Sequence, residues 1–310
     1  MRAFLLETGL FLTLLSAMIS GSLYFFNSQV AQNANFKLPN PHKIIILGHS
    51  HPECAYNDSL ISNCRNLSES GEAYLYTAFK LEQVLAQNPS VETVWLEVSN
   101  NQMQASINNW ITEEKYLSFR YNKYLPFFGW GEYALIAENN PSAFFNELAM
   151  AIKLNGKKWL KKDYDFSQSI GKFARLEVAK VDSFLNNPQM LKPLPNWDKI
   201  SNFQLIYLQK MVKICQKYGK KLFFIRSPMH EKCPHWQSEK MFKDILAREF
   251  SDIEFLDFSG FGLKNEELAD LEHLNAVGAA RYSVWIDDLL KKGLLLDNDK
   301  QNFIQKQVFF

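Results

Sequence analysis

Short apolar runs that alternate with helical patterns limit this chain to a small group of folds. Residues 43–47 (KIIIL) form an uninterrupted β-branched run that ends at Gly48. Such a run is typical of a strand buried on both faces, and strands of this kind belong to parallel sheets. Further strands are expected at residues 64–68, 93–98, 221–226 and 253–258. Helices are expected at residues 71–87, 201–218, 241–250 and 276–290. The alternation predicts an α/β fold, with helices on both faces of a mostly parallel five-stranded sheet.

The middle of the chain has no comparable strand pattern. At 310 residues, the chain can hold one α/β core together with an insertion. We expect one α/β domain over residues 42–310, with a mainly helical insertion at residues 102–197. Aromatic residues of the insertion could line a sugar or lipid groove, but packing against the core is the preferred interpretation.

The N-terminal segment has the composition of a membrane span. Residues 8–26 contain no charged residue, and this length is close to the roughly 20 residues that cross a bilayer core. We expect an anchor over residues 1–27 and a spacer over residues 28–41. A cleaved signal peptide is the alternative, with Ser20 and Ser22 as the small residues before the cleavage point.

The charges beside the apolar stretch predict on which side of the membrane the domain lies. Arg2 is the basic residue before the stretch, and Lys37 is the first one after it. This asymmetry favours an N-terminus inside and a domain on the extracytoplasmic side, periplasmic or extracellular. The whole chain has 34 basic and 33 acidic residues, so its net charge of +1 gives no reason to expect a nucleic-acid partner.

The cysteine count is consistent with an oxidising compartment. Cys54, Cys64, Cys215 and Cys233 can form two disulfides, and sequence alone permits three pairings. Pairing of Cys54 with Cys64 and of Cys215 with Cys233 is the simplest expectation. No C-x-x-C spacing is present, so the sequence does not support a structural zinc site or a thioredoxin-like pair.

Residues that follow the expected strands are the candidates for chemistry. In open α/β sheets, ligands bind beyond the carboxyl ends of the strands. The polar blocks at those positions are GHSH at residues 48–51, NLSESG at residues 66–71, SNN at residues 99–101, SPMH at residues 227–230 and DLEHLN at residues 270–275.

In this order the blocks resemble the SGNH, or GDSL-type, hydrolase superfamily, in which a serine follows the first strand and Asp-x-x-His precedes the last helix. The resemblance covers residues 43–292 apart from the insertion, and the Asp-x-x-His-Leu-Asn-x-x-Gly block is its most specific part. It implies a flavodoxin-like three-layer αβα fold. It also implies that Ser50 is the nucleophile, that His273 is its general base and that Asp270 orients the imidazole.

The resemblance further implies an oxyanion hole formed by Gly71 and by Asn100 or Asn101. The usual glycine before the asparagine is missing, so the choice between the two asparagines stays open. Backbone N–H groups and an amide aimed at an oxyanion stabilise it by on the order of 3 kcal/mol per donor. His49 replaces the acidic residue that usually precedes the serine.

The residue types support this chemistry without the resemblance. A serine hydroxyl is a poor nucleophile until an imidazole takes its proton, and the imidazole needs a partner that fixes its tautomer. Each residue also has a structural interpretation. Ser50 can cap a helix, and His273 can be a hydrogen-bonded structural histidine. Asp270 can be a loop acid, and Gly71 can adopt the positive φ that the entry to a helix requires.

Two other classes of function stay open. His49-x-His51-x-Glu53 resembles the paired histidines of metal-dependent hydrolase barrels. Further zinc ligands would then be His230, His235 or His273. An eight-stranded barrel, however, needs more βα units than the sequence contains. A non-catalytic glycan-binding module with a hydrolase-like fold is the other alternative.

The preferred interpretation is a membrane-anchored serine esterase or O-acyltransferase. Its expected substrate is an acyl ester, with acetyl as the preferred acyl group, on a cell-envelope or exported polysaccharide. His49, His51 and His230 are candidate substrate contacts. The expected partners are the membrane, an acylated carbohydrate or small molecule, and the machinery of envelope polysaccharides, with no cofactor and no metal.

Overall fold

The computed structural model describes residues 1–178, 181–192 and 196–308. Its contacts divide the chain into two compact units. The helical unit comprises Met1–Asn35 and Ile111–Phe166, and the α/β unit comprises Phe36–Trp110 and Ser167–Phe310. Each unit is described by itself.

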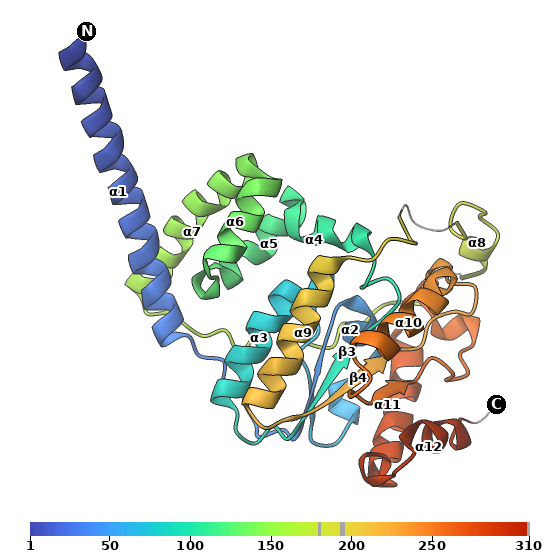
Figure 1. Ribbon diagram of the computed structural model, residues 1–310. Coiled ribbons are helices and arrows are strands. Elements are labelled where there is room, and N and C mark those ends of the chain that lie inside the picture. The colour runs from blue at the N-terminus through green and yellow to red at the C-terminus, as the bar shows by residue number, and fades with distance from the viewer. Residues whose placement is uncertain (179–180, 193–195, 309–310) are drawn as a thin grey trace. The chain divides into compact units, whose positions relative to one another are not determined.

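The α/β unit contains a five-stranded, all-parallel sheet (Figure 1). The strands are β1 (Ile44–Leu47), β2 (Cys64–Asn66), β3 (Thr93–Glu97), β4 (Lys221–Arg226) and β5 (Phe255–Asp257). Their order is β2-β1-β3-β4-β5, which is the flavodoxin-like order. Ile46 of β1 pairs with Asn66 on one side and with Trp95 on the other, so the carboxyl ends of these strands are level. The α/β prediction is confirmed.

Both faces of the sheet are apolar, which explains why the strand sequences lack polar alternation. Ile46, Trp95 and Phe223 belong to the core cluster that also contains Tyr282 and Ile286 of helix α11 (Ala276–Lys291). The alternate residues of the strands are also buried, as expected for the opposite face. Helices α3 (Tyr74–Gln87) and α9 (Asn202–Lys217) pack side by side (Figure 1).

The remaining helical segments of the α/β unit are short. They are α2 (Ser50–Ala55), α8 (Val181–Leu185), α10 (Glu239–Glu249) and α12 (Lys300–Lys306), with 3₁₀ turns at Asp58–Leu60, Ala105–Asn108, Pro234–Ser238, Asn265–Glu267 and Leu294–Leu296. Helix α4 (Asn109–Thr112) lies where the chain passes from one unit to the other. The four helices predicted from the sequence correspond to α3, α9, α10 and α11, and each begins and ends within a few residues of its predicted bounds.

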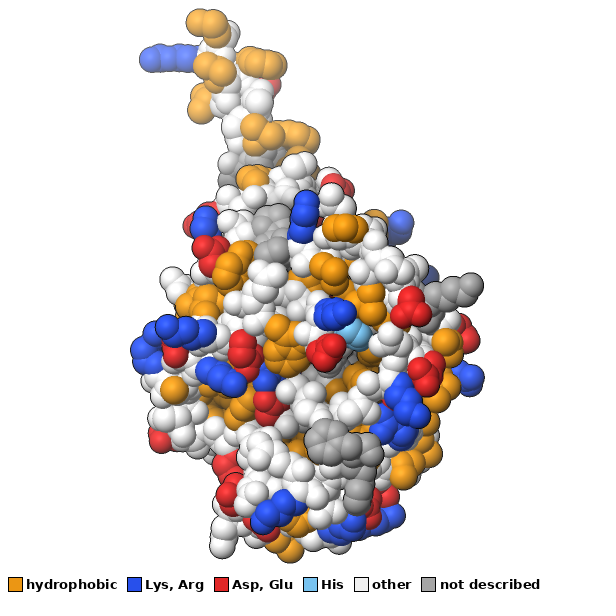
Figure 2. Space-filling model, turned by 90° about the vertical axis from the view of Figure 1, so that its right-hand side faces the viewer, with side chains coloured by type: hydrophobic (Ala, Val, Ile, Leu, Met, Phe, Trp, Pro, Cys, Tyr) orange, Lys and Arg blue, Asp and Glu red, His pale blue; other side chains and the backbone are white. Residues whose placement is uncertain are grey.

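The helical unit is built around one long apolar helix, α1 (Arg2–Asn33), which packs against α7 (Pro141–Lys161). The unit also contains α5 (Glu114–Tyr124), a 3₁₀ turn at Leu125–Phe127 and α6 (Trp130–Asn139). The mean hydropathy of α1 reaches 1.8 over 18 residues, and the residues of that window are not buried. Hydrophobic side chains cover its N-terminal turns on the face shown in Figure 2. By length and composition, α1 can cross a membrane.

Two expected segment bounds differ from the structure. The expected spacer at residues 28–41 begins inside a helix, because α1 continues to Asn33. The expected insertion at residues 102–197 is divided, since only residues 111–166 of it belong to the helical unit. The residues from Ser167 onward pack with the α/β unit. For example, Ala174 donates a backbone hydrogen bond to Glu53 and Ala276 donates one to Leu176.

The expected disulfides do not form among the four cysteines, all of which lie in the described part of the chain. Cys54, Cys64, Cys215 and Cys233 are free and buried. Cys215 lies in α9, whereas Cys233 lies in the loop after β4, so nearness in sequence does not pair them. Burial raises the pKa of the Cys54, Cys215 and Cys233 thiols to about 12, which makes them small core residues of low reactivity.

Candidate active site

Ser50 lies at the first turn of α2, directly beyond the carboxyl end of β1. The turn between them depends on Gly48, whose φ of 155° favours glycine. A Cβ at Gly48 would lie 2.5 Å from the Cβ of Glu97 at the end of β3. The close approach of the two strand ends thus requires glycine, and it fixes where the Ser50 hydroxyl is held.

Ser50, His273 and Asp270 form one chain of hydrogen bonds. The Nε2 atom of His273 lies 2.7 Å from the Ser50 Oγ, and its Nδ1 lies 2.9 Å from both carboxylate oxygens of Asp270. Asp270 also accepts from the backbone N–H groups of Glu272 and His273, at 2.7 and 2.8 Å. These bonds fix the carboxylate, so that Nδ1 carries the proton and Nε2 faces the serine as an acceptor.

The electrostatics of the pair suit a base that takes up a proton. Burial opposes protonation of His273, but the hydrogen bond and the charge of Asp270 outweigh it and raise its pKa. Burial would raise the pKa of Asp270, but the bond and the charge of His273 outweigh it and lower that pKa. The His273 side chain is 18% exposed, so a substrate can reach it.

The segment that carries His273 is held by the residues that follow it. Asn275 caps α11 by accepting from the N–H groups of Val277 and Gly278, and its amide donates to the carbonyls of Glu266 and Leu268. A Cβ at Gly278 would collide with the backbone oxygen of Glu267. The Asn-x-x-Gly part of the sequence block therefore has a structural reason: it fixes the loop before α11.

Glu272 joins two histidines beside the Ser50–His273–Asp270 chain. Its Oε2 lies 3.4 Å from the Nε2 of His51 and 3.3 Å from the Nε2 of His235. Burial would raise the pKa of Glu272, but these two histidines hold it well below its usual range. No role for Glu272 was predicted from the sequence, although the residue lies between Asp270 and His273. Only the fold brings His51 and His235 to it.

His49 organises a second chain of hydrogen bonds. Its Nδ1 accepts from the backbone N–H of His51 at 3.3 Å, so the proton of the neutral ring lies on Nε2. This Nε2 lies 3.0 Å from the Ser99 Oγ, which donates to the Oδ1 of Asn101 at 2.7 Å. Burial and the neighbouring histidines hold the pKa of His49 well below its usual range, so the ring stays neutral. One backbone N–H thus sets the orientation of the Asn101 amide.

Asn100 belongs to a different network. Its amide nitrogen donates to Glu239 at 2.8 Å, and its oxygen accepts from Arg226 at 3.0 Å. Arg226 is 2% exposed and also pairs with Glu239 and with Asp257 of β5. Both the nitrogen and the oxygen of the Asn100 amide are therefore hydrogen-bonded to the buried ion-pair network at the ends of β4 and β5.

The other two candidate residues lie in loops with different partners. Gly71 has a φ of 66°, which suits glycine, and the preceding Ser70 donates to the Glu53 carboxylate of α2 through both its backbone and its hydroxyl. His230 donates its backbone N–H to Leu271 and accepts from Lys232 through Nδ1. His230 lines a pocket of about 550 Å³ to which Ser50 and His273 do not contribute.

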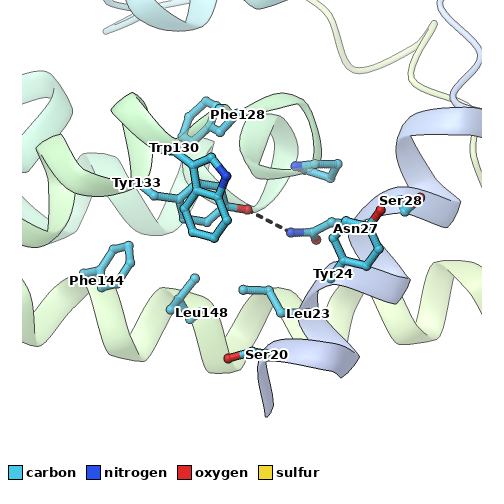
Figure 3. A pocket seen from close by; sticks show the side chains of 12 residues that line it. Ser20, Leu23, Tyr24, Asn27, Ser28, Phe128, Trp130, Tyr133, Phe144 and Leu148 are labelled. Atoms are coloured by element: carbon cyan, nitrogen blue, oxygen red, sulfur yellow. Dashed lines mark hydrogen bonds between the residues drawn. The ribbon is translucent and has the colours of Figure 1, made fainter. Parts of the chain in front are cut away.

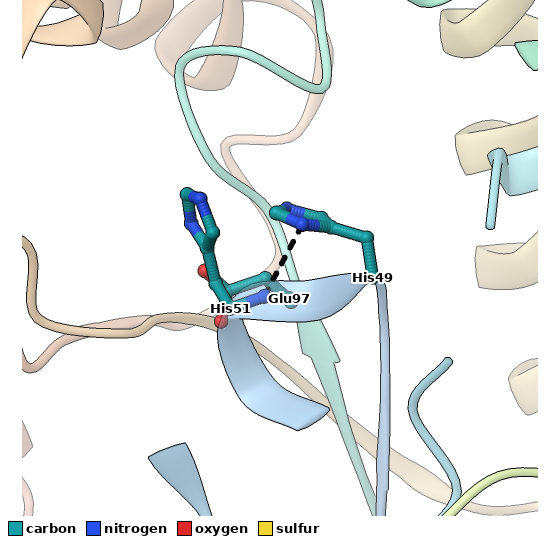
Figure 4. A group of neighbouring side chains, drawn as sticks. All are labelled: His49, His51 and Glu97. Carbon is teal, nitrogen blue, oxygen red and sulfur yellow. Dashed lines mark hydrogen bonds between the residues drawn. The ribbon is translucent and has the colours of Figure 1, made fainter. Parts of the chain in front are cut away.

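The histidines do not favour a metal site. The ligand atoms of His49, His51 and Glu97 lie within 4.8 Å of one another (Figure 4). However, His49 is occupied on both nitrogens, and Glu97 accepts from the backbone and the hydroxyl of Ser227. Burial raises the pKa of Glu97 to about 8, which favours its neutral form over the carboxylate that binds metals. His273, in the second such group, is likewise occupied on both nitrogens by Ser50 and Asp270.

Comparisons with known proteins do not assign a family to this chain. No family model matches this chain, and no curated protein matches it. One solved structure, from Streptococcus pneumoniae, is assigned provisionally as a platelet activating factor. It aligns over 91% of this chain and 99% of its own length, with a TM-score of 0.41 and 12% sequence identity.

Proposed function

We propose that this chain is a serine esterase or O-acyltransferase of the SGNH type. The observation that carries the proposal is the hydrogen-bonded chain from the Ser50 hydroxyl through His273 to Asp270, at 2.7 and 2.9 Å. A structural histidine does not need a carboxylate on one nitrogen and a solvent-accessible serine hydroxyl on the other. This arrangement prepares the hydroxyl to lose its proton.

The reaction follows from these contacts in two steps. The Ser50 Oγ attacks the acyl carbon while the His273 Nε2 takes the hydroxyl proton, and the Asp270 carboxylate stabilises the imidazolium. The bond between the acyl carbon and the alcohol oxygen then breaks, and the protonated His273 gives its proton to the departing alkoxide. The acyl group remains bonded to the Ser50 Oγ. In the second step, water or a sugar hydroxyl attacks the acyl carbon and gives its proton to His273. The bond between the acyl carbon and the Ser50 Oγ then breaks, and His273 returns the proton to this oxygen, which restores the serine.

Asn101, rather than Asn100, is the better candidate for the oxyanion hole. The Asn100 amide nitrogen already donates to Glu239. The Asn101 oxygen is held by Ser99, which leaves its amide nitrogen to point at a ligand. Together with the backbone N–H groups of Ser50 and Gly71, it would stabilise the developing negative charge.

The proposed substrate is an acyl ester, most simply acetyl, of an envelope or exported polysaccharide. This part of the proposal follows from α1, which is long and apolar enough to hold the α/β unit at a membrane. The charge asymmetry between Arg2 and Lys37 favours the extracytoplasmic side.

The test is hydrolysis of a chromogenic acetyl ester by the full chain in detergent micelles. Ser50→Ala and His273→Ala should each lower kcat by about 10⁴-fold or more, because neither residue acts without the other. The matched controls are Ser251→Ala, in an exposed turn before β5, and His42→Gln, before β1, and both should keep the wild-type rate. Equal rates in all five proteins would remove the catalytic assignment.

A further inference from the structure

The helical unit contains an apolar pocket of about 490 Å³, a volume in the roughly 300–1,000 Å³ range of small-molecule sites. Its walls come from α1, α6 and α7 and from the segment just before α6 (Figure 3). They include Leu23 and Tyr24 of α1, Trp130 and Tyr133 of α6, and Phe144 and Leu148 of α7. The residues of the described chain that line it include no charged side chain.

Three polar side chains of the pocket wall, Asn27, Ser28 and Tyr133, already have hydrogen-bond partners within the protein. The Asn27 amide nitrogen donates to the Tyr133 hydroxyl at 3.0 Å, and the Asn27 oxygen accepts from Asn155 at 2.8 Å (Figure 3). The Ser28 hydroxyl accepts from Gln32 at 2.9 Å. Most of the side chains that line the pocket are apolar and none of those described is charged, so the pocket favours a hydrocarbon ligand.

The pocket lies at the end of the apolar stretch of α1. Residues 8–26 carry no charge, and a bilayer core takes about 20 helical residues. The part of α1 that lines the pocket runs from Ser20 to Ser28. If α1 spans a bilayer, the pocket therefore lies where the helix leaves the hydrocarbon core.

Large apolar side chains stand exposed beside this pocket. Trp130 is 91% exposed and Tyr24 is 77% exposed, while Phe145 of α7 is 67% exposed. Tryptophan and tyrosine are enriched at the boundary between membrane and water, where the ring is apolar and its polar atom reaches water. An exposed apolar patch of this kind indicates an interaction surface, and its continuity with α1 indicates that the membrane is the partner.

Basic residues lie at the matching level of the neighbouring helix. Gly156 of α7 faces the ring of Phe26: a Cβ atom at Gly156 would lie 3.4 Å from that ring. The rings of Trp159 and Phe25 pack edge to face, with their centroids 5.5 Å apart. The next turn of α7 and its C-cap carry exposed Lys157, Lys161 and Lys162. Lysines just past the end of an apolar stretch suit the phosphate groups of anionic lipids.

We propose that the helical unit lies on the membrane surface and that its pocket binds an acyl chain of a bilayer phospholipid. The wall supplies apolar contact for the chain, Trp130 and Tyr24 lie at the interface, and the lysines of α7 face the headgroups. This proposal rests on α1 as a membrane anchor but not on the serine chemistry of the α/β unit.

The test is photolabelling of the full chain in vesicles of phosphatidylcholine and phosphatidylglycerol. The probe is a phosphatidylcholine with a diazirine in one acyl chain, and labelled peptides are identified by mass spectrometry. Label on α1 alone is expected of any spanning helix. Label on residues 126–148 is expected if an acyl chain reaches α6 and α7, and the variants below distinguish entry into the pocket from contact with its exposed rim.

Two variants at one position make the result specific. Leu148→Glu places a charge in the pocket and Leu148→Trp fills it, and each should lower the label on residues 126–148 by about tenfold or more while α1 keeps its label. Ile206→Glu on α9, where the native side chain is 59% exposed, is the matched control and should change nothing. Circular dichroism and the acetyl-ester rate of each variant report folding and the separate activity.

Three results would overturn the proposal. Label confined to α1 would show that no acyl chain reaches the pocket. Label on residues 126–148 that neither Leu148 variant reduces would place the lipid outside the pocket. Crosslinks between two chains at these residues, in place of lipid label, would identify a second copy of the chain as the occupant.

Discussion

The two units treat their polar and apolar groups in opposite ways. In the α/β unit, ionisable side chains are buried at the carboxyl ends of the strands and are joined in hydrogen-bonded chains, such as Ser50–His273–Asp270. In the helical unit, large apolar side chains such as Trp130 and Phe145 are exposed instead. Buried polar groups that are fully paired hold a fixed geometry, whereas exposed aromatic groups need a partner that covers them.

The difference teaches which kind of function each unit can support. Fixed charges in a low dielectric favour proton transfer, because the groups need not reorganise during the reaction. An apolar surface favours binding to hydrocarbon. If this division is right, substitutions in one unit should change activity without changing membrane contact, and substitutions in the other should do the reverse.

Asp270→Asn tests the α/β side most severely. The amide cannot hold the His273 proton on Nδ1, so we expect kcat on an acetyl ester to fall by about 10³–10⁴-fold. In the wild type, Asp270 raises the His273 pKa, so activity should decline on acidification with a midpoint above 6.5, and the variant's midpoint should be lower. A pH–rate profile of kcat/KM checks both effects. An unchanged midpoint would contradict the role of Asp270.

Asn101→Ala and Asn100→Ala separate catalysis from structure within one loop. Loss of the Asn101 amide should lower kcat by about 10²–10³-fold with little loss of stability. Loss of Asn100 should leave Glu239 and Arg226 with fewer partners and lower the free energy of unfolding by about 1–3 kcal/mol. Steady-state kinetics and thermal unfolding of both variants make the comparison. A loss of kcat in Asn100→Ala, with a loss of stability in Asn101→Ala, would instead place the oxyanion contact on Asn100.

Glu97→Gln tests whether a buried acid is kept neutral. The folded-state pKa of Glu97 is raised to about 8 by burial, against 4.5 for the ordinary group, so the folded state holds this proton more tightly than the unfolded state. Its stabilising contribution therefore decreases as pH rises toward 8. Between pH 6.5 and 8 the wild type should lose about 2 kcal/mol that the variant does not lose. Below this window, the lowered pKa values of the buried histidines His49 and His51 have the opposite effect, so that stability increases as pH rises.

Unfolding midpoints measured from pH 6.5 to 8 give the result for both proteins. Glu82→Gln, at a partly exposed acid on α3, is the control and should follow the wild type. Parallel curves for wild type and Glu97→Gln would mean that the carboxyl group is ionised in the folded protein.

Asn27→Ala tests the helical unit and should have no effect on activity. It removes the partner of Asn155 and of Tyr133, so we expect a loss of stability of about 1–3 kcal/mol. The rate on a soluble acetyl ester should stay at the wild-type value, since no contact of the Ser50 site changes. Thermal unfolding in micelles and the ester assay are the measurements. A large loss of rate without loss of fold would mean that the two units are coupled.

The sequence predicted the sheet well because each strand is a local pattern. An uninterrupted run such as residues 43–47 is stable only when both faces are covered, and this requirement can be recognised without the rest of the chain. The positions of Ser50 and Asp270 beyond strand ends follow from the same patterns. Their meeting at His273 was a prediction about distance in space, and in the structure the three side chains are joined by hydrogen bonds.

The tertiary structure decided which residues become partners, because local sequence patterns do not contain this information. The partners of Glu272 are His51 and His235, which lie far from it in sequence. Asn100 and Asn101 are neighbours in sequence but have different hydrogen-bond partners, Glu239 and Ser99. The free state of the four thiols and the division of the insertion were decided in the same way. Periodicity reports which face of an element is buried. The residue that lies against that face depends on how the whole chain packs.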